Sequence, residues 1–284
     1  MQIKNRFASF VFDKFDASIR FSYCKLGFVS KIFNKFLFWK LYSSNFIELD
    51  RRFEKMYECI LKNNINLKDK VILELGPGNS YINAYNFLLK GSKKVILIDK
   101  FPRQIKTKKQ LKYFLEEIDY IKNKYKIDSL FFLDKSNNIK SEYITFISKD
   151  LVESDIKTSV DFIYSISVFE HIKNITENIK KLAEILVSGG YMYHHIDLRD
   201  HYNFNSPFLF YKYSDYAWNK YLTKEGVSYT NRWRYDDYIK VFADNGLSLI
   251  NSEIENFSIE QVKINPMFFG KNVECGITNV LLKK

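Results

Sequence analysis

Hydrophobic and polar positions follow two alternating patterns from residue 70 onward. Short, continuous apolar runs such as "KVILELG" (70–76) and "KVILID" (94–99) predict strands that are covered on both faces of a sheet. Between them, apolar residues recur at helical spacing in "YINAYNFLLKG" (81–91), which predicts a helix that ends near Gly91. Strands that alternate with helices in this way favour an α/β fold.

The same two patterns continue to the end of the sequence. Further helices are predicted over about 104–125, over 175–190, where the pair Gly189 and Gly190 closes the helix, and over 235–246. Further strands are predicted over 143–151, 161–167, 191–198, 247–256 and 274–284. Seven strands with interleaved helices predict a doubly wound, mostly parallel sheet of the Rossmann-like kind.

Residues 1–65 differ in pattern, and we predict that they form an N-terminal helical extension to a main domain over 66–284. Aromatic residues recur there at roughly helical spacing among basic ones, which predicts two or three amphipathic helices. Two interpretations are open. Either the helices pack as a cap on the main domain, or segments such as "SKIFNKFLFWK" (30–40) contact a membrane surface or a partner protein.

The composition is ordinary for a soluble globular protein, with 46% hydrophobic and 27% charged residues. The net charge of +11 comes mainly from lysine in a chain also rich in Asn, Ile, Phe and Tyr, a bias that weakens it as evidence for a nucleic-acid partner. The widely spaced Cys24, Cys59 and Cys275 argue against a disulfide framework or a zinc knuckle. No apolar run approaches the roughly 18 residues of a spanning helix. We therefore expect a cytoplasmic protein, with peripheral attachment to the inner face of the membrane as an open alternative.

The turn after the first predicted strand, in "VILELGPGNS" (71–80), carries two glycines. Glycine lets a backbone approach a ligand closely, and open α/β sheets bind ligands at the carboxyl ends of their strands. A dinucleotide fingerprint needs a third glycine where this chain has Tyr81, and the G-K-[ST] of a phosphate-binding loop is absent. Instead, Glu74 precedes the first glycine by two residues. Asp99 ends the next strand, where a carboxylate can accept hydrogen bonds from ribose hydroxyls.

Two later segments extend this pattern. "SKDL" (148–151) places Asp150 at the end of the third predicted strand, where an acid can accept a hydrogen bond from an adenine amino group. "DFIYSISVFEHI" (161–172) is followed by "LAEILVSGGYMYHHID" (182–197). Together with the glycine turn, these segments resemble the class I S-adenosylmethionine-dependent methyltransferases over roughly 70–200, and most closely their small-molecule branch.

The resemblance implies S-adenosylmethionine as cofactor and assigns roles at the first two strands. The backbone at Gly76 and Gly78 would contact the methionine part and the ribose. Glu74 would orient this loop and reach the methionine ammonium, and Asp99 would hold the ribose. Solvated strand-end acids are the alternative for both carboxylates.

The resemblance also implies roles at the third and fourth strands. Asp150 and the backbone of Leu151 would bind adenine, and Ser165 would line the methionine end of the cofactor. His171 lies just after the fourth strand, where it would contact the substrate or cap the turn.

Methyl transfer to a hydroxyl needs a group that takes the hydroxyl proton. His195 and Asp197 point to one face of the fifth strand, so we predict His195 as general base with Asp197 as its orienting carboxylate, and His201 as the second candidate. Packing and helix-cap roles are the alternative. The same three residues match a two-histidine, one-carboxylate metal pattern, but nothing else in the sequence supports a metal, so we predict none.

An aromatic insert over 202–233 follows the fifth strand, in the place that commonly covers the acceptor in this fold. Aromatic faces suit sugar rings, and Arg199, Arg232 and Arg234 suggest a phosphate or carboxylate on the substrate, unless they form a packed lid with acidic partners. "HHIDLRDHY" and "NRWRYDDY" resemble methyltransferases of bacterial surface-polysaccharide gene sets. This resemblance implies O-methylation of a sugar, glycan or phosphorylated small molecule.

Three other functions compete with this interpretation. An RNA or DNA methyltransferase is disfavoured because the segment after the fourth strand reads "SISVFE" rather than [DNS]-P-P-[YFW]. A non-enzymatic scaffold, held at a membrane or glycosyltransferase complex by residues 1–60, is disfavoured by the intact glycine turn and Asp99. A nicotinamide-dependent oxidoreductase is disfavoured by Tyr81.

Overall fold

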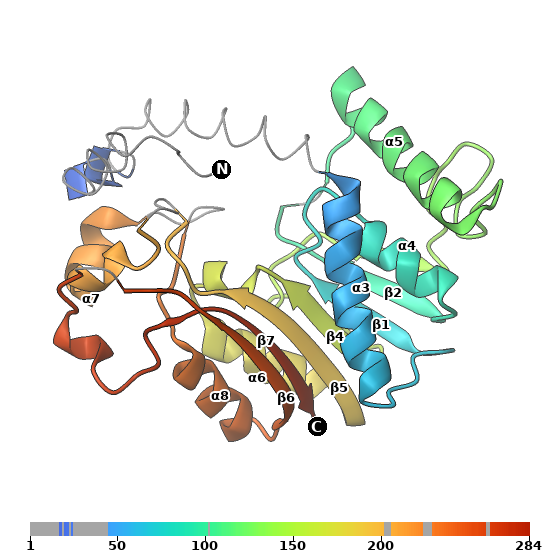
Figure 1. Ribbon diagram of the computed structural model, residues 1–284. Coiled ribbons are helices and arrows are strands. Elements are labelled where there is room, and N and C mark those ends of the chain that lie inside the picture. The colour runs from blue at the N-terminus through green and yellow to red at the C-terminus, as the bar shows by residue number, and fades with distance from the viewer. Residues whose placement is uncertain are drawn as a thin grey trace. The chain divides into compact units, whose positions relative to one another are not determined.

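The computed structural model describes residues 17, 18, 20–22, 24, 45–101, 103–201, 206–223, 229–259 and 262–284 (Figure 1). The extension is predicted over 1–65, and most of its residues 1–44 lie outside the described residues. Parts of the predicted insert over 202–233 also lie outside them. Helix α3 (Phe46–Lys62) falls within the predicted extension. Arg20, also in that range, is buried and forms an ion pair with Asp200.

Seven strands form one sheet in the order β3-β2-β1-β4-β5-β7-β6. Their bounds are β1 (Val71–Leu75), β2 (Lys94–Ile98), β3 (Ile144–Ile147), β4 (Val160–Ile166), β5 (Leu186–Asp197), β6 (Ser248–Asn256) and β7 (Cys275–Lys283). The pairs β1–β2, β1–β4 and β2–β3 are parallel. β7 runs antiparallel to β5, because Leu198 bonds to Gly276 while Gly189 bonds to Lys284. The predicted doubly wound, mostly parallel sheet is confirmed.

The helices alternate with the strands, as the sequence pattern predicts. They are α4 (Ile82–Leu89), α5 (Lys108–Tyr125), α6 (Ile175–Ile185), α7 (Asp215–Ala217) and α8 (Tyr235–Asp244), with shorter turns η1 (Phe169–His171), η2 (Leu209–Lys212), η3 (Trp218–Leu222) and η4 (Pro266–Phe268). Thr107 begins α5 with a capping box, in which its hydroxyl accepts from the Gln110 N–H and the Gln110 side chain reaches back.

One predicted boundary is wrong. The pair Gly189–Gly190 does not close α6, which ends at Ile185, but lies inside β5. The backbone N–H of Gly189 donates to the Lys284 carbonyl, and the Lys284 N–H donates to the Gly190 carbonyl, each at 3.0 Å. Pairing with the far end of the chain therefore outweighs the local tendency of glycine to end a helix.

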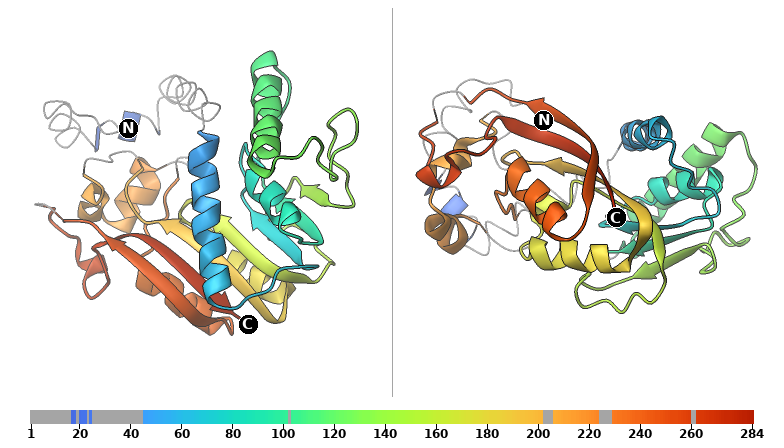
Figure 2. Two further views of the ribbon diagram at one scale, coloured as in Figure 1. Left: turned by 45° about the vertical axis from the view of Figure 1, so that its right-hand side comes forward. Right: turned by 90° about the horizontal axis from the view of Figure 1, so that it is seen from below.

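The chain forms two compact units. Unit 1 contains residues 1–37, 167–179 and 194–281, and unit 2 contains residues 38–166, 180–193 and 282–284. In unit 2, helices α3, α4 and α5 lie on one side of β1 and β2 (Figure 2). Phe87 of α4 packs against Phe53 of α3 and Tyr164 of β4, with ring centroids 4.9 and 5.0 Å apart, so these elements share one aromatic core.

A buried carboxylate fixes the start of α4 in unit 2. Oε1 of Glu117 accepts from the Ser80 hydroxyl at 2.5 Å and from the Tyr81 N–H at 2.9 Å. Oε2 of Glu117 accepts from Arg103 at 2.7 Å, and the Arg103 guanidinium also lies 4.4 Å from the Tyr81 ring centroid. Glu117 therefore ties α5 to the turn that leads from β1 into α4.

In unit 1, the described part of the aromatic insert packs on itself. Phe208, Phe210, Tyr211, Trp218 and Leu222 form a hydrophobic cluster with Phe268. The Trp218 indole N–H donates to the Thr230 carbonyl at 2.9 Å, so the cluster is also anchored to the segment that precedes α8.

Replacing Arg103 by Met should destabilise the protein by about 3–5 kcal/mol, because it leaves the fully buried Glu117 carboxylate without its cation. Urea denaturation would measure this loss. The control is Arg51→Met, which breaks an exposed pair with Glu48 on α3 and should leave the free energy of unfolding nearly unchanged. Equal effects of the two substitutions would contradict the anchoring role of Glu117.

Candidate functional site

The glycine turn after β1 has the backbone geometry that only glycine adopts easily. Gly76 and Gly78 have φ angles of 71° and 62°. The Gly76 N–H donates to the Ile98 carbonyl at 2.9 Å, and the Gly78 N–H donates to Oδ2 of Asp99 at 3.2 Å. A Cβ atom built on Gly78 would meet nothing within 4 Å, so space lies open beside the turn.

Glu74 is buried in β1 beside this turn, with 3% of its surface exposed. Its Oε1 accepts from the Asn83 amide at 3.1 Å. Its Oε2 is buried and has no hydrogen-bond partner among the described residues. Burial raises the pKa of Glu74 from 4.5 to about 7. A cationic group placed beside this carboxylate would favour its ionised form and so lower its pKa.

The other cofactor residues predicted from the sequence lie at the carboxyl ends of neighbouring strands. Leu75 of β1 stands opposite both Ile98 of β2 and the buried Ser165 of β4. Asp99 follows β2 and also accepts from the Phe101 N–H at 2.7 Å. Burial raises the pKa of Asp99. The structure therefore brings Glu74, Asp99 and Ser165 to one edge of the sheet.

Asp150 and Leu151 follow β3, the neighbour of β2. The Asp150 side chain is 38% exposed and lies 3.9 Å from the Lys100 ammonium. Its Oδ1 accepts from the Val152 N–H at 3.2 Å, while Leu151 is buried. The acid is thus held in place by its own turn and keeps an exposed oxygen.

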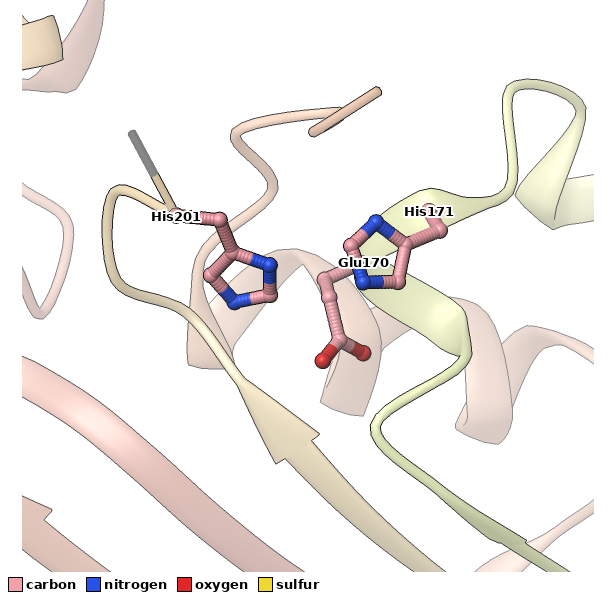
Figure 3. Close-up of side chains that lie close together, drawn as sticks. All are labelled: Glu170, His171 and His201. Carbon is pink, nitrogen blue, oxygen red and sulfur yellow. The ribbon is translucent and has the colours of Figure 1, made fainter. Parts of the chain in front are cut away.

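Four polar side chains lie together in unit 1, directly after β4 and β5. Glu170 and His171 belong to η1, and Asp197 and His201 end and follow β5. The nearest ligand atoms of Glu170, His171 and His201 all lie within 4.8 Å of one another, and Figure 3 shows these side chains facing each other. The Asp197 N–H donates to Oε1 of Glu170 at 3.3 Å. We call this group the polar cluster.

Each imidazole of the polar cluster has one nitrogen beside an oxygen of a neighbouring residue. Nδ1 of His171 lies 2.6 Å from the Tyr229 carbonyl oxygen, so it carries the proton and Nε2 carries the lone pair. Nε2 of His201 lies 3.6 Å from Oδ2 of Asp197. Asp197 is itself held by a bidentate pair with Arg199, at 2.8 Å for both contacts.

Burial and charge act in different directions on the pKa values of the polar cluster. Burial raises the pKa of Glu170 to about 8 and lowers that of His171 to about 4. Burial also opposes the charge of His201, but Asp197 and Glu170 outweigh it and raise the pKa of His201. Burial of Asp197 is outweighed by its bonds to Arg199 and His201, so its pKa is lowered.

The arrangement around His195 differs from the prediction. Nδ1 of His195 lies 2.7 Å from Oδ1 of Asn279 on β7, and the Asn279 amide donates to Glu253 of β6 at 3.1 Å. The contacts described above place Asp197 with Arg199 and His201. The reason is that the antiparallel strand β7 brings a side chain directly opposite His195, whereas Asp197 lies at the strand end, where the chain turns back through His201.

The arginines predicted to bind substrate also require a correction. Arg234 is fully buried and donates to the carbonyls of Leu198 and Cys275 at 2.8 and 2.5 Å. Arg232 is buried as well and donates to two insert carbonyls and to Asp215. Both guanidinium groups are committed to the protein's own backbone, as in the packed-lid alternative. Arg199 is partly buried over the Phe257 ring.

Sequence reasoning missed two asparagines and a strained serine. The Asn231 amide donates to the carbonyls of Phe169 and Ile172 at 2.8 and 3.0 Å, which clamps η1. Asn279 holds His195, as described above. Ser167, between β4 and η1, has a φ of 55°, a strained value of the kind that gathers at functional sites. Asn231 and Ser167 lie in the segments "NRWRYDDY" and "DFIYSISVFEHI" that the sequence had singled out, but neither was predicted as a site residue.

A family model described as a methyltransferase domain matches residues 48–251. The chain belongs to this methyltransferase family. The sheet order of the methyltransferase, with β7 antiparallel between β5 and β6, is that of the Rossmann-like methyltransferase fold. It acts with S-adenosylmethionine as its cofactor. A search of curated proteins finds no match.

Solved structures resemble this methyltransferase at low identity. One is a methyltransferase from Methanosarcina mazei, with 13% identity, a TM-score of 0.49 and coverage of 79% of this chain and 96% of that chain. Another is magnesium protoporphyrin IX methyltransferase from Synechocystis with bound S-adenosylmethionine, with 10% identity, a TM-score of 0.45 and coverage of 84% and 81%. At these values the likenesses carry no argument about the acceptor or the mechanism.

The residues of the methyltransferase fit its cofactor. The buried carboxylate of Glu74 is a suitable acceptor for the cofactor's ammonium, and the open space beside Gly78 leaves room for close approach to the backbone. Asp99 already holds the Gly78 N–H with one oxygen, so it can fix the turn and accept from a hydroxyl at once. Among the described residues, no helix is long and apolar enough to cross a membrane.

Replacing Asp99 by Ala should weaken S-adenosylmethionine binding by about 10- to 100-fold, because it removes a charged acceptor and frees the Gly78 turn. Calorimetric titration with S-adenosylmethionine and S-adenosylhomocysteine would measure this change. The matched control is Asp155→Ala, an acid of the same unit whose side chain is 79% exposed. Unchanged affinity in the Asp99 variant would remove this residue from the cofactor site.

Stability of the cofactor-free protein should fall as pH rises through the pKa of Glu74. The pKa is about 7 in the folded protein and 4.5 ordinarily, so the folded state holds more protons between these values. The stabilisation present below pH 4.5 should be lost as pH rises to about 7, by roughly 3 kcal/mol at most. Glu74→Gln should lack this loss. Urea denaturation of both proteins across pH 4–8 gives a difference curve in which the other titrating groups cancel, and parallel curves would contradict the assignment.

Proposed function

We propose that the protein transfers a methyl group from S-adenosylmethionine to a hydroxyl of a sugar, glycan or similar small acceptor in surface-polysaccharide biosynthesis. The observation that carries this proposal is the polar cluster, in which Asp197 orients His201 and both face a buried acid and a second imidazole. A neutral hydroxyl must lose its proton as the new bond forms, and such a cluster supplies groups for that purpose.

The reaction converts a hydroxyl into a methyl ether and releases S-adenosylhomocysteine and one proton. S-adenosylmethionine supplies the methyl group. The protein's residues hold the two reactants in line and act on the hydroxyl proton. We assign the second role to His201 rather than to His195, because the Asp197 carboxylate lies beside the ring of His201, whereas Asn279 engages the ring of His195.

The side chains of the aromatic insert narrow the chemical class of the methyl acceptor. Arg232 and Arg234 are used by the backbone, which removes the main reason to expect a phosphate on the substrate. Tyr216 and Tyr221 are exposed at the surface, with ring centroids 6.1 Å apart, and offer aromatic surface of the kind that packs on sugars. The Lys220 ammonium lies 4.8 and 5.3 Å from the two ring centroids and covers part of that surface. A neutral, hydroxyl-rich acceptor therefore fits these residues better than a strongly anionic one.

The experiment is a screen of the purified protein with S-adenosylmethionine against free sugars, nucleotide sugars, glycans, amines and a mixed RNA. Release of S-adenosylhomocysteine and the mass gain of one methyl group identify the product. Methylation of a sugar hydroxyl is the expected result. Methylation confined to amines or to RNA would overturn the proposal.

With an acceptor in hand, His201→Asn should lower kcat by about 10²-fold and leave S-adenosylmethionine affinity unchanged. His195→Asn is the matched control, because His195 is held by Asn279 in a separate hydrogen-bond chain. It should lower kcat by much less. The opposite ranking of the two variants would return the base assignment to His195.

A further inference from the structure

The polar cluster has the composition and the geometry of a transition-metal site. Its candidate ligand atoms are one carboxylate oxygen of Glu170 and one ring nitrogen each of His171 and His201, all within 4.8 Å of one another. Three atoms at these separations can converge on one ion after small side-chain movements, because bonds from Zn²⁺ to nitrogen and oxygen are about 2.0–2.2 Å long. Figure 3 shows the imidazoles of His201 and His171 on either side of the Glu170 side chain.

The surroundings of each imidazole are those of a metal ligand. Metal-binding histidines usually donate the second ring N–H to a carbonyl or a carboxylate, which fixes the ring and increases its basicity. Nδ1 of His171 is placed against the Tyr229 carbonyl, and Nε2 of His201 lies beside the Asp197 carboxylate.

The acid of the cluster is buried and has few hydrogen bonds among the described residues. Glu170 is 1% exposed, and its Oε2 has no hydrogen-bond partner among the described residues. Its Oε1 accepts a long hydrogen bond, 3.3 Å, from the Asp197 N–H. A carboxylate buried in this way is costly unless it is neutralised or coordinates a cation.

We propose that Glu170, His171 and His201 bind one divalent transition-metal ion, with Asp197 and the Tyr229 carbonyl orienting the two imidazoles. Two nitrogen ligands and one oxygen ligand favour Zn²⁺, Co²⁺, Fe²⁺ or Mn²⁺ over Mg²⁺ or Ca²⁺, which prefer oxygen alone. These three proposed ligands differ from the triplet His195, Asp197 and His201 that matched a metal pattern in the sequence. Asn279 and Arg199 engage two members of that triplet.

Three protein ligands leave coordination positions open. Resting on the proposed function, we assign those positions to the acceptor, because a cation there would bind the hydroxyl and lower its pKa. With the cation bound, His201 would be its ligand, oriented by Asp197, rather than the group that takes the proton. The proton of the cation-bound hydroxyl would pass to solvent as the oxygen bonds to the methyl group. Vicinal hydroxyls, as in sugars, could fill two open positions at once.

The test is titration of the EDTA-treated, desalted protein with Co²⁺, Zn²⁺ and Mg²⁺, without cofactor or acceptor. We expect one equivalent of Co²⁺ to bind with micromolar or tighter affinity, with visible absorption of nitrogen-bound Co²⁺, and Mg²⁺ to bind far more weakly. Zn²⁺ should displace the Co²⁺ signal. Absence of Co²⁺ and Zn²⁺ binding at micromolar concentrations would overturn the proposal.

Variants locate the site. His201→Asn should weaken Co²⁺ binding by at least 10-fold, and Asp197→Asn by about 10- to 100-fold through the loss of orientation. His195→Asn, the control, should bind as the unaltered protein does. Because Glu170 is buried, Glu170→Gln is interpreted only if its circular dichroism and Tm match the parent. Equal losses in the His195 and His201 variants would contradict the assignment.

The failure of this proposal and of the proposed function can be told apart. If the protein binds metal but methylates no sugar, the proposed metal site stands and the proposed acceptor class is rejected. If protein shown to be metal-free methylates a sugar hydroxyl at a rate that EDTA does not lower, the metal site is rejected and the proposed acceptor stands. Turnover that is lost on EDTA treatment and restored by Co²⁺ or Zn²⁺ would support both.

Discussion

The parallel pairing of β1 between β2 and β4 is the constraint on which the cofactor site depends. Leu75 stands opposite Ile98 on one side and Ser165 on the other, so three strands end at one edge. Because parallel strands share a direction, the residues that follow them must meet at that edge. The strands are almost wholly buried, and a slip of one residue would turn Glu74 toward the opposite face.

Much of the cofactor side of the molecule, around β1, β2 and β4, could be predicted from the sequence because the patterns that mark it are local. Continuous apolar runs mark β1, β2 and β4, and each functional carboxylate lies at or near the end of such a run. The exception is the glycine pair within β5. Gly189 and Gly190 look like a helix end locally, yet they pair with Lys284, and no local pattern carries a hydrogen bond to a residue so distant.

The acceptor side was predicted less well, for a physical reason. The period of two along β5 correctly separates His194, which stacks on Phe169, from His195, but it does not say which neighbour each side chain meets. That neighbour comes from β7 for His195 and from the returning chain for Asp197. Likewise, Arg232 and Arg234 look like substrate ligands because arginine is usually exposed, and only the packed insert shows that their guanidinium groups serve the backbone.

The short stretch from Tyr229 to Asn231 has one further consequence. Its first residue holds the ring of His171 through a carbonyl, its second accepts the Trp218 indole N–H, and its third clamps η1. The hydrophobic cluster around Trp218 and the polar cluster are therefore both anchored to residues 229–231. A displacement of residues 229–231 would therefore change the contacts of both the Trp218 indole and the His171 ring within unit 1.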